Sequence, residues 1–132
     1  VQVKLAHFGY YVGMSYQIID DILDFTGTEK ELGKPSGGDL LQGNITLPVL
    51  FAMEDESIRS KIVEVHPNMS REEMDRIINI IIQSGAIERA RDISNRYLEK
   101  ALLIVDQLPQ NEAKKTLKNI SHSALPKGDD SR

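Results

Sequence analysis

The sequence contains no cysteine, few aromatic residues and no long apolar run. The absence of cysteine excludes disulfides and thiolate metal sites, and it is typical of a reducing compartment, so we expect a cytoplasmic protein. The longest apolar stretches, near residues 77–82 and 101–105, are far shorter than the roughly 20 residues that cross a bilayer, so we predict no transmembrane segment. The 16 basic residues form no tract among 20 acidic ones, which gives no indication of nucleic-acid binding.

The 132 residues are enough for one hydrophobic core, and their composition favours helices. Hydrophobic residues make up 40% of the chain and aromatic residues 5%, whereas a sheet sandwich would be richer in Val, Thr, Tyr and Phe. Apolar positions recur at spacings of three and four, with glycine and proline between the segments. We therefore predict an all-α fold with helices over about residues 2–25, 46–53, 58–65, 71–84, 87–108 and 111–125.

The apolar spacings also predict which helix faces are buried. In the first helix the expected buried stripe is Leu5, Phe8, Val12, Ile19 and Leu23. In the helix over residues 87–108 the expected face is Ile93, Tyr97, Ala101, Ile104 and Leu108. The glycine-rich residues 26–44 are predicted to form a loop.

The two ends of the chain give further expectations. Val1 enters the first helical pattern with no capping residue before it, so we expect the chain to begin inside a helix of an incomplete domain. We expect residues 1–125 to form the helical part of that domain and residues 126–132 a disordered tail.

A row of carboxylates marks the end of the first helix. Asp20 and Asp24 are four residues apart and therefore share one face, with Asp21 beside them and Gln17 one turn earlier. Like charges at this spacing repel, and a hard divalent cation removes that cost; magnesium is commonly held by one or two carboxylates together with substrate phosphates. The alternative interpretation is a solvated acidic face near a helix end.

The glycine-rich segment that follows favours the metal–phosphate interpretation. Glycines in residues 33–38 allow close backbone approach to a ligand, Lys34 supplies a cation for a diphosphate oxygen, and Asp39 supplies a further carboxylate. The segment is no Walker motif, and by itself it is equally compatible with an ordinary flexible connector. Its position directly after the acidic row is what gives it weight.

These two segments resemble the trans-isoprenyl (polyprenyl) diphosphate synthase family. Residues 13–24 are similar to the family's second aspartate-rich motif, Gly-x-x-Phe/Tyr-Gln-x-x-Asp-Asp-x-x-Asp, and residues 33–40 and 43–48 match the segments that follow it. Within the family, residues 39–48 are most similar to the catalytic subunit of bacterial heptaprenyl or hexaprenyl diphosphate synthases. The resemblance implies the C-terminal helices of an isoprenoid synthase bundle.

The resemblance also implies an activity. Family members condense isopentenyl diphosphate with an allylic prenyl diphosphate using Mg²⁺, and they act as homo- or hetero-oligomers. Carried over by position, it implies that Asp20, Asp21 and Lys34 are catalytic and that Gln17, Lys34 and Tyr16 bind substrate. The implied metal residues are Asp20, Asp21, Asp24 and Asp39.

The sequence departs from the family pattern in ways that bear on activity. The first aspartate-rich motif is absent, and Asn44 stands where many members have a lysine. We therefore expect this chain to supply one metal half-site and to be inactive alone. A non-catalytic helical interaction subunit and a fragment of a class I terpene cyclase are the alternatives.

Overall fold

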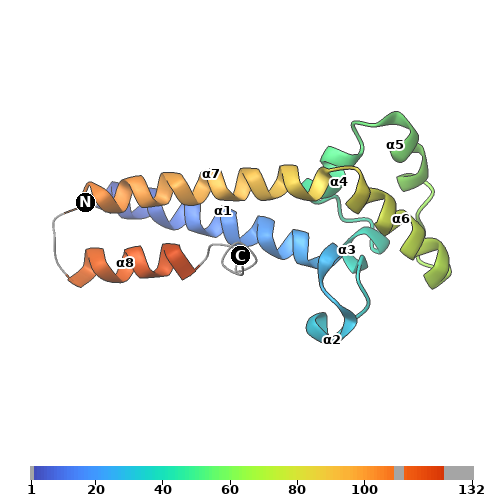
Figure 1. Ribbon diagram of the computed structural model, residues 1–132, viewed down its shortest axis with the longest axis horizontal. Helices are drawn as coiled ribbons and strands as arrows, with labels where there is room; N and C mark the ends of the chain where they lie inside the picture. Colours follow the sequence, from blue (N-terminus) through green and yellow to red (C-terminus); the bar gives the residue numbers. More distant parts are fainter. Residues whose placement is uncertain (1, 109–111, 124–132) are drawn as a thin grey trace. The chain divides into compact units, whose positions relative to one another are not determined.

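The computed structural model describes residues 2–108 and 112–123, and the regular structure of these residues is entirely helical (Figure 1). This confirms the predicted all-α fold. The helices are α1 (Gln2–Thr26), α2 (Glu29–Leu32), α3 (Gly38–Leu41), α4 (Leu47–Ala52), α5 (Glu56–Ile62), α6 (Arg71–Gln83), α7 (Ala86–Asp106) and α8 (Glu112–Ser123). The predicted disordered tail over residues 126–132 lies outside the described residues.

The chain divides into two compact units, residues 1–17 with 92–132 and residues 18–91. In the first unit, α1 and α7 pack together around a small core of Phe8, Val12, Ala101 and Val105. Leu117 of α8 packs against this core. Burial of these side chains is the main favourable contribution to the stability of the unit.

The buried faces of α1 and α7 differ from the predicted ones. Leu5 and Leu23 are 41% and 44% exposed, so their assignment to the core was wrong. The fully buried positions instead include Ser15 and Ser94, whose hydroxyl oxygens lie 2.7 Å apart in a hydrogen bond between the two helices. The two serine hydroxyls satisfy each other's hydrogen-bonding capacity, so they can be buried between the helices. A pattern of apolar residues cannot identify such a polar pair.

The face of α7 is displaced by about one residue from the prediction. The fully buried side chains in its second half are Leu98, Ala101 and Val105, whereas Ile93 and Tyr97 are only partly buried. Among the described residues of the predicted face, only Ala101 is fully buried. Small residues at the seam let the helices approach closely, and the larger apolar side chains lie at its edges.

The second unit is built around α6, which contacts α4 and α5. Its buried side chains are Met74, Ile77, Ile78 and Ile81. Ser70 caps the helix by accepting the Glu73 N–H, and Gly85 ends the segment in a left-handed conformation with φ of 88°. These caps confirm the predicted start and end of α6.

Residues 26–44 are more ordered than the loop that was predicted. They contain two short helices, α2 and α3, so the assignment to continuous loop was wrong. Thr28 and Glu31 form a reciprocal capping box around α2, and Gly33 ends it with φ of 71°. Local side-chain hydrogen bonds therefore stabilise α2 in a segment whose glycine content suggested no helix, whereas α3 has no side-chain cap.

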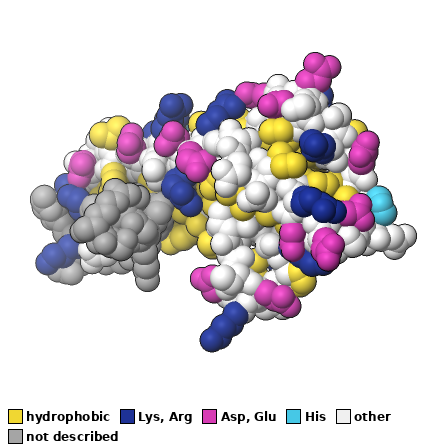
Figure 2. Space-filling model, turned by 45° about the vertical axis from the view of Figure 1, so that its right-hand side comes forward, with side chains coloured by type: hydrophobic (Ala, Val, Ile, Leu, Met, Phe, Trp, Pro, Cys, Tyr) yellow, Lys and Arg dark blue, Asp and Glu magenta, His cyan; other side chains and the backbone are white. Residues whose placement is uncertain are grey.

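Within the part of the chain that the structure describes, no helix is long and apolar enough to cross a membrane. On the face shown in Figure 2, acidic and basic side chains are interspersed and neither sign forms a large patch.

Candidate functional site

The end of α1 carries the three predicted carboxylates in three different environments. Asp20 is exposed, Asp21 is partly buried, and Asp24 is only 4% exposed. Asp24 is covered because the segment after α2 returns to it: the Asp39 N–H donates to Asp24 Oδ2 at 3.2 Å, and the Gly37 N–H donates to the Asp24 carbonyl oxygen at 2.8 Å. The end of the helix and the glycine-rich segment therefore form one local structure.

The second carboxylate oxygen of Asp24 is unsatisfied. Asp24 Oδ1 is buried and accepts no hydrogen bond, and Lys34 Nζ lies 3.9 Å away, too far for a hydrogen bond. Burial raises the pKa of the Asp24 carboxyl above its ordinary value, although the hydrogen bond from the Asp39 N–H acts in the opposite direction. A buried anionic oxygen with free lone pairs is costly unless a cation neutralises it.

Lys34 lies on the segment that covers Asp24. Its ammonium group is largely exposed, and the backbone of Gly38 lies next to both Lys34 Nζ and Asp24 Oδ1. Gly37 adopts φ of 81°, a left-handed conformation that favours glycine. The segment therefore brings an exposed cation close to a buried carboxylate oxygen.

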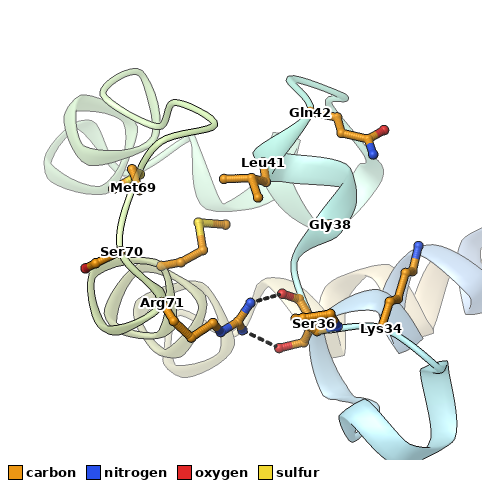
Figure 3. Close-up of a pocket in the computed structure, with 10 residues that line it drawn as sticks. Lys34, Ser36, Gly38, Leu41, Gln42, Met69, Ser70 and Arg71 are labelled. Carbon is orange, nitrogen blue, oxygen red and sulfur yellow. Dashed lines mark hydrogen bonds between the residues drawn. The ribbon is translucent and has the colours of Figure 1, made fainter.

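A hollow of about 360 Å³ lies between this segment and the start of α6 (Figure 3). Its walls include Met69 and Met74, and Arg71 extends across it to Ser36. Arg71 Nη1 donates to the Ser36 carbonyl oxygen at 2.9 Å, and Nη2 donates to Ser36 Oγ at 3.0 Å. Neither Arg71 nor Ser36 was predicted as a site residue, because a contact between residues 35 apart gives no local signal in the sequence.

Comparison with known proteins identifies the family. A sequence model described as polyprenyl synthetase matches residues 1–81. The chain belongs to the polyprenyl synthetase family. It is 54% identical over 118 residues to heptaprenyl diphosphate synthase component 2 of Geobacillus stearothermophilus, a match that covers 89% of this chain and 37% of that protein. Component 2 of Bacillus subtilis is 50% identical over 121 residues, covering 92% of this chain and 35% of that protein.

Solved polyprenyl synthetase structures agree with this assignment. Heptaprenyl diphosphate synthase from Staphylococcus aureus superposes with a TM-score of 0.86 at 44% identity, covering 92% of this chain and 38% of that one. Polyprenyl synthase from Caulobacter crescentus, described as complexed with calcium and isoprenyl diphosphate, gives 0.77 at 27% identity, covering 92% and 38%. The expected family resemblance is confirmed, and the chain spans less than two fifths of the length of these relatives.

The structure brings together only part of the predicted site of this polyprenyl synthetase chain. Asp24, Lys34 and Asp39 are neighbours, and Asp20 and Asp21 lie about one turn earlier on α1. Tyr16 and Gln17, the predicted substrate-binding residues, are exposed on α1 in the first unit. Across residues 2–108 and 112–123, no group of three or more His, Cys, Asp or Glu side chains is arranged to hold a metal ion.

The residues present nevertheless fit a magnesium ion held jointly with a diphosphate. The unsatisfied Asp24 Oδ1 is a hard oxygen donor of the type that magnesium prefers. Magnesium usually keeps several waters and takes one or two protein carboxylates, with the remaining ligands supplied by phosphates. A complete cage of protein ligands is therefore unnecessary for this ion.

The buried Asp24 carboxyl gives a prediction about stability in the absence of divalent cations. Its pKa is higher in the folded chain than in the unfolded one, so the folded state binds more protons between pH 3.8 and that raised value. Stability therefore falls as pH rises through this window. We expect Asp24→Asn to remove this contribution, so that the variant gains stability relative to the original chain as pH rises. Urea unfolding at several pH values measures this difference; one that does not change with pH would contradict the assignment.

Proposed function

We propose that this chain contributes the second aspartate-rich half-site of a magnesium-dependent trans-polyprenyl diphosphate synthase. The proposed reaction is the condensation of isopentenyl diphosphate with an allylic prenyl diphosphate. The observation that carries the proposal is the buried, unsatisfied Asp24 Oδ1 beside Lys34, at the end of an acidic helix in a polyprenyl synthetase chain. This arrangement favours a synthase over a terpene cyclase fragment.

The environments of the carboxylates suggest different roles. Asp20 is exposed and can approach a metal ion directly, so we assign it as the direct ligand. Asp24 and Asp39 are tied to each other through the Asp39 N–H, and together with Asp21 they would hold the water shell of the ion. Two neighbouring carboxylates also make the end of α1 attractive to a second cation.

The cationic and polar groups would bind the substrate. Lys34 is exposed on a flexible stem and can follow a diphosphate oxygen over a short distance. Gln17 lies one turn before Asp20 on the same helix and would donate to the diphosphate, while Tyr16 beside it would contact the prenyl chain. Bound magnesium would stabilise the negative charge on the departing diphosphate. Lys34 adds a second positive charge for the same group.

A partner subunit is part of the proposal. The bacterial relatives at 54% and 50% identity are named component 2, which describes one member of a multi-component synthase. We propose that this chain likewise acts in an oligomer with a second subunit. A purely structural role within such an oligomer is the alternative, and binding of a diphosphate distinguishes the two.

Calorimetric titration of the chain with an allylic diphosphate tests the proposal. We expect binding with magnesium present and its loss when EDTA removes the ion. Lys34→Met should weaken binding about 10- to 100-fold, because charge-assisted hydrogen bonds contribute roughly 1.5–3 kcal/mol. Lys30→Met is the matched control, since it removes the same charge from exposed α2. Equal binding with EDTA, or equal effects of the two substitutions, would overturn the assignment.

A further inference from the structure

Arg71, the first residue of α6, holds the middle of the segment that carries Lys34. Its guanidinium donates to both the carbonyl oxygen and the hydroxyl of Ser36, at 2.9 and 3.0 Å, as the dashed lines of Figure 3 show. Asp75 orients the guanidinium, because Arg71 Nε donates to Asp75 Oδ1 at 2.7 Å one turn along the helix. The planar guanidinium reaches Ser36 and Asp75 together through separate nitrogens, whereas the three donors of an ammonium lie on a single nitrogen.

A second contact packs the same segment against α6. A Cβ atom at Gly37 would lie 2.5 Å from Ile78 Cδ1 and 3.2 Å from Met74 Cε, so the Gly37 backbone lies directly on these buried side chains. On its other side, Gly37 donates its N–H to the Asp24 carbonyl oxygen. The segment is therefore held between the end of α1 and the start of α6.

Pro35 is the one residue between Ser36 and Lys34, so the position of Ser36 restricts that of Lys34. Pro35 fixes its own φ and restricts Lys34 to extended backbone conformations, so the two bonds from Arg71 limit where the Lys34 side chain begins. From that point Lys34 Nζ reaches to 3.9 Å from Asp24 Oδ1. Loss of the Arg71 contacts would leave the packing at Gly37 intact and free the Lys34 end of the segment.

We infer that Arg71 is a positioning residue, which holds Lys34 where its ammonium group can bind the allylic diphosphate. The inference rests on the proposed function, and it adds α6 to the elements that build the half-site. Arg71 contributes little to the stability of the fold, because its side chain is 42% exposed and exposed ion pairs are weak. We therefore expect loss of the Arg71 side chain to weaken substrate binding and to leave the stability of the fold nearly unchanged.

Steady-state kinetics of a synthase assembled with this chain test this role, with a partner subunit supplied where turnover requires one. We expect Arg71→Met to raise the KM for the allylic diphosphate about 3- to 10-fold, with the KM for isopentenyl diphosphate and the melting temperature nearly unchanged. Arg71→Lys should behave like Arg71→Met, because it keeps the charge but loses the separate nitrogens that contact Ser36 and Asp75 together. Arg76→Met is the matched control: Arg76 is exposed on the same helix and faces a different hollow, with Lys61 and Glu73.

A double variant separates this inference from the proposed function. If Arg71 acts through Lys34, Arg71→Met adds no further rise in KM to a Lys34→Met protein. Independent, multiplicative effects would overturn the inference, as would full rescue by Arg71→Lys or a fall in kcat and melting temperature with KM unchanged. A Lys34→Met protein with normal KM would overturn the proposed function and the inference together, whereas an effect of Lys34→Met without one of Arg71→Met overturns the inference alone.

Discussion

Replacing Asp20 by asparagine is expected to lower turnover about 100- to 1000-fold while leaving the fold intact. Asparagine has nearly the same shape as aspartate, but it is uncharged and offers a hard cation one weak oxygen donor. Because Asp20 is exposed near the end of α1, the free energy of unfolding should change by less than about 0.5 kcal/mol. Asp20 is a cleaner probe than Asp24, whose carboxylate also accepts the Asp39 N–H and contributes to the local structure.

The magnesium dependence of turnover provides the measurement. A synthase assembled with this chain is titrated with magnesium at saturating substrates, and Asp20→Asn should need a higher concentration of the ion. Asp92→Asn makes the same chemical change at an exposed position of α7 and serves as the control. An Asp20→Asn protein whose turnover and magnesium requirement both equal those of the control would exclude Asp20 as a direct metal ligand.

Sequence periodicity predicted the lengths of the helices better than their buried faces. The prediction for α1 covered residues 2–25, and the helix is Gln2–Thr26, ending where Gly27 follows. Leu5 and Leu23 were placed in the core because they are apolar, yet the seam passes through Ser15 and Ser94. The spacing of apolar residues shows that a segment is helical, but which face is buried depends on the helix that packs against it. Small or polar residues at that interface contribute little to a hydrophobic pattern.

The candidate site was predictable only where its geometry is local. A spacing of four residues places Asp20 and Asp24 on one helix face whatever the rest of the fold does. The burial of Asp24 accompanies its contact with the segment of Asp39, whose N–H donates to its carboxylate, whereas Asp20 remains exposed. The contact between Arg71 and Ser36 depends on how α6 packs in the second unit, and no local spacing encodes it.

Replacing Gly37 by alanine is expected to destabilise the protein by about 2–5 kcal/mol. A left-handed conformation costs a residue with a Cβ roughly 1–2 kcal/mol, and overpacking a core site costs roughly 1–3 kcal/mol more. Both apply here, since φ is 81° and the new Cβ would lie 2.5 Å from Ile78 Cδ1. Ile78 is only 5% exposed, so the clash falls within the core. Urea unfolding of the full chain measures the loss.

Two matched variants separate the strain from the clash. Gly33 has a similar φ of 71°, but its Cβ would meet nothing within 4 Å, so Gly33→Ala reports the backbone cost alone and should destabilise less than Gly37→Ala. Ile78→Val deletes the clashing methyl group, and the double variant Gly37→Ala/Ile78→Val should be more stable than the sum of the two changes predicts.

The same comparison bears on the proposed site. Movement of Gly37 away from Ile78 displaces the segment that carries Lys34 and Asp39, so Gly37→Ala should weaken magnesium-dependent diphosphate binding, and Ile78→Val should restore part of it in the double variant. Equal losses for Gly33→Ala and Gly37→Ala would show that α6 does not support the segment. A loss specific to Gly37, relieved at Ile78, would mean that the packing of α6 sets the position of the phosphate-binding groups.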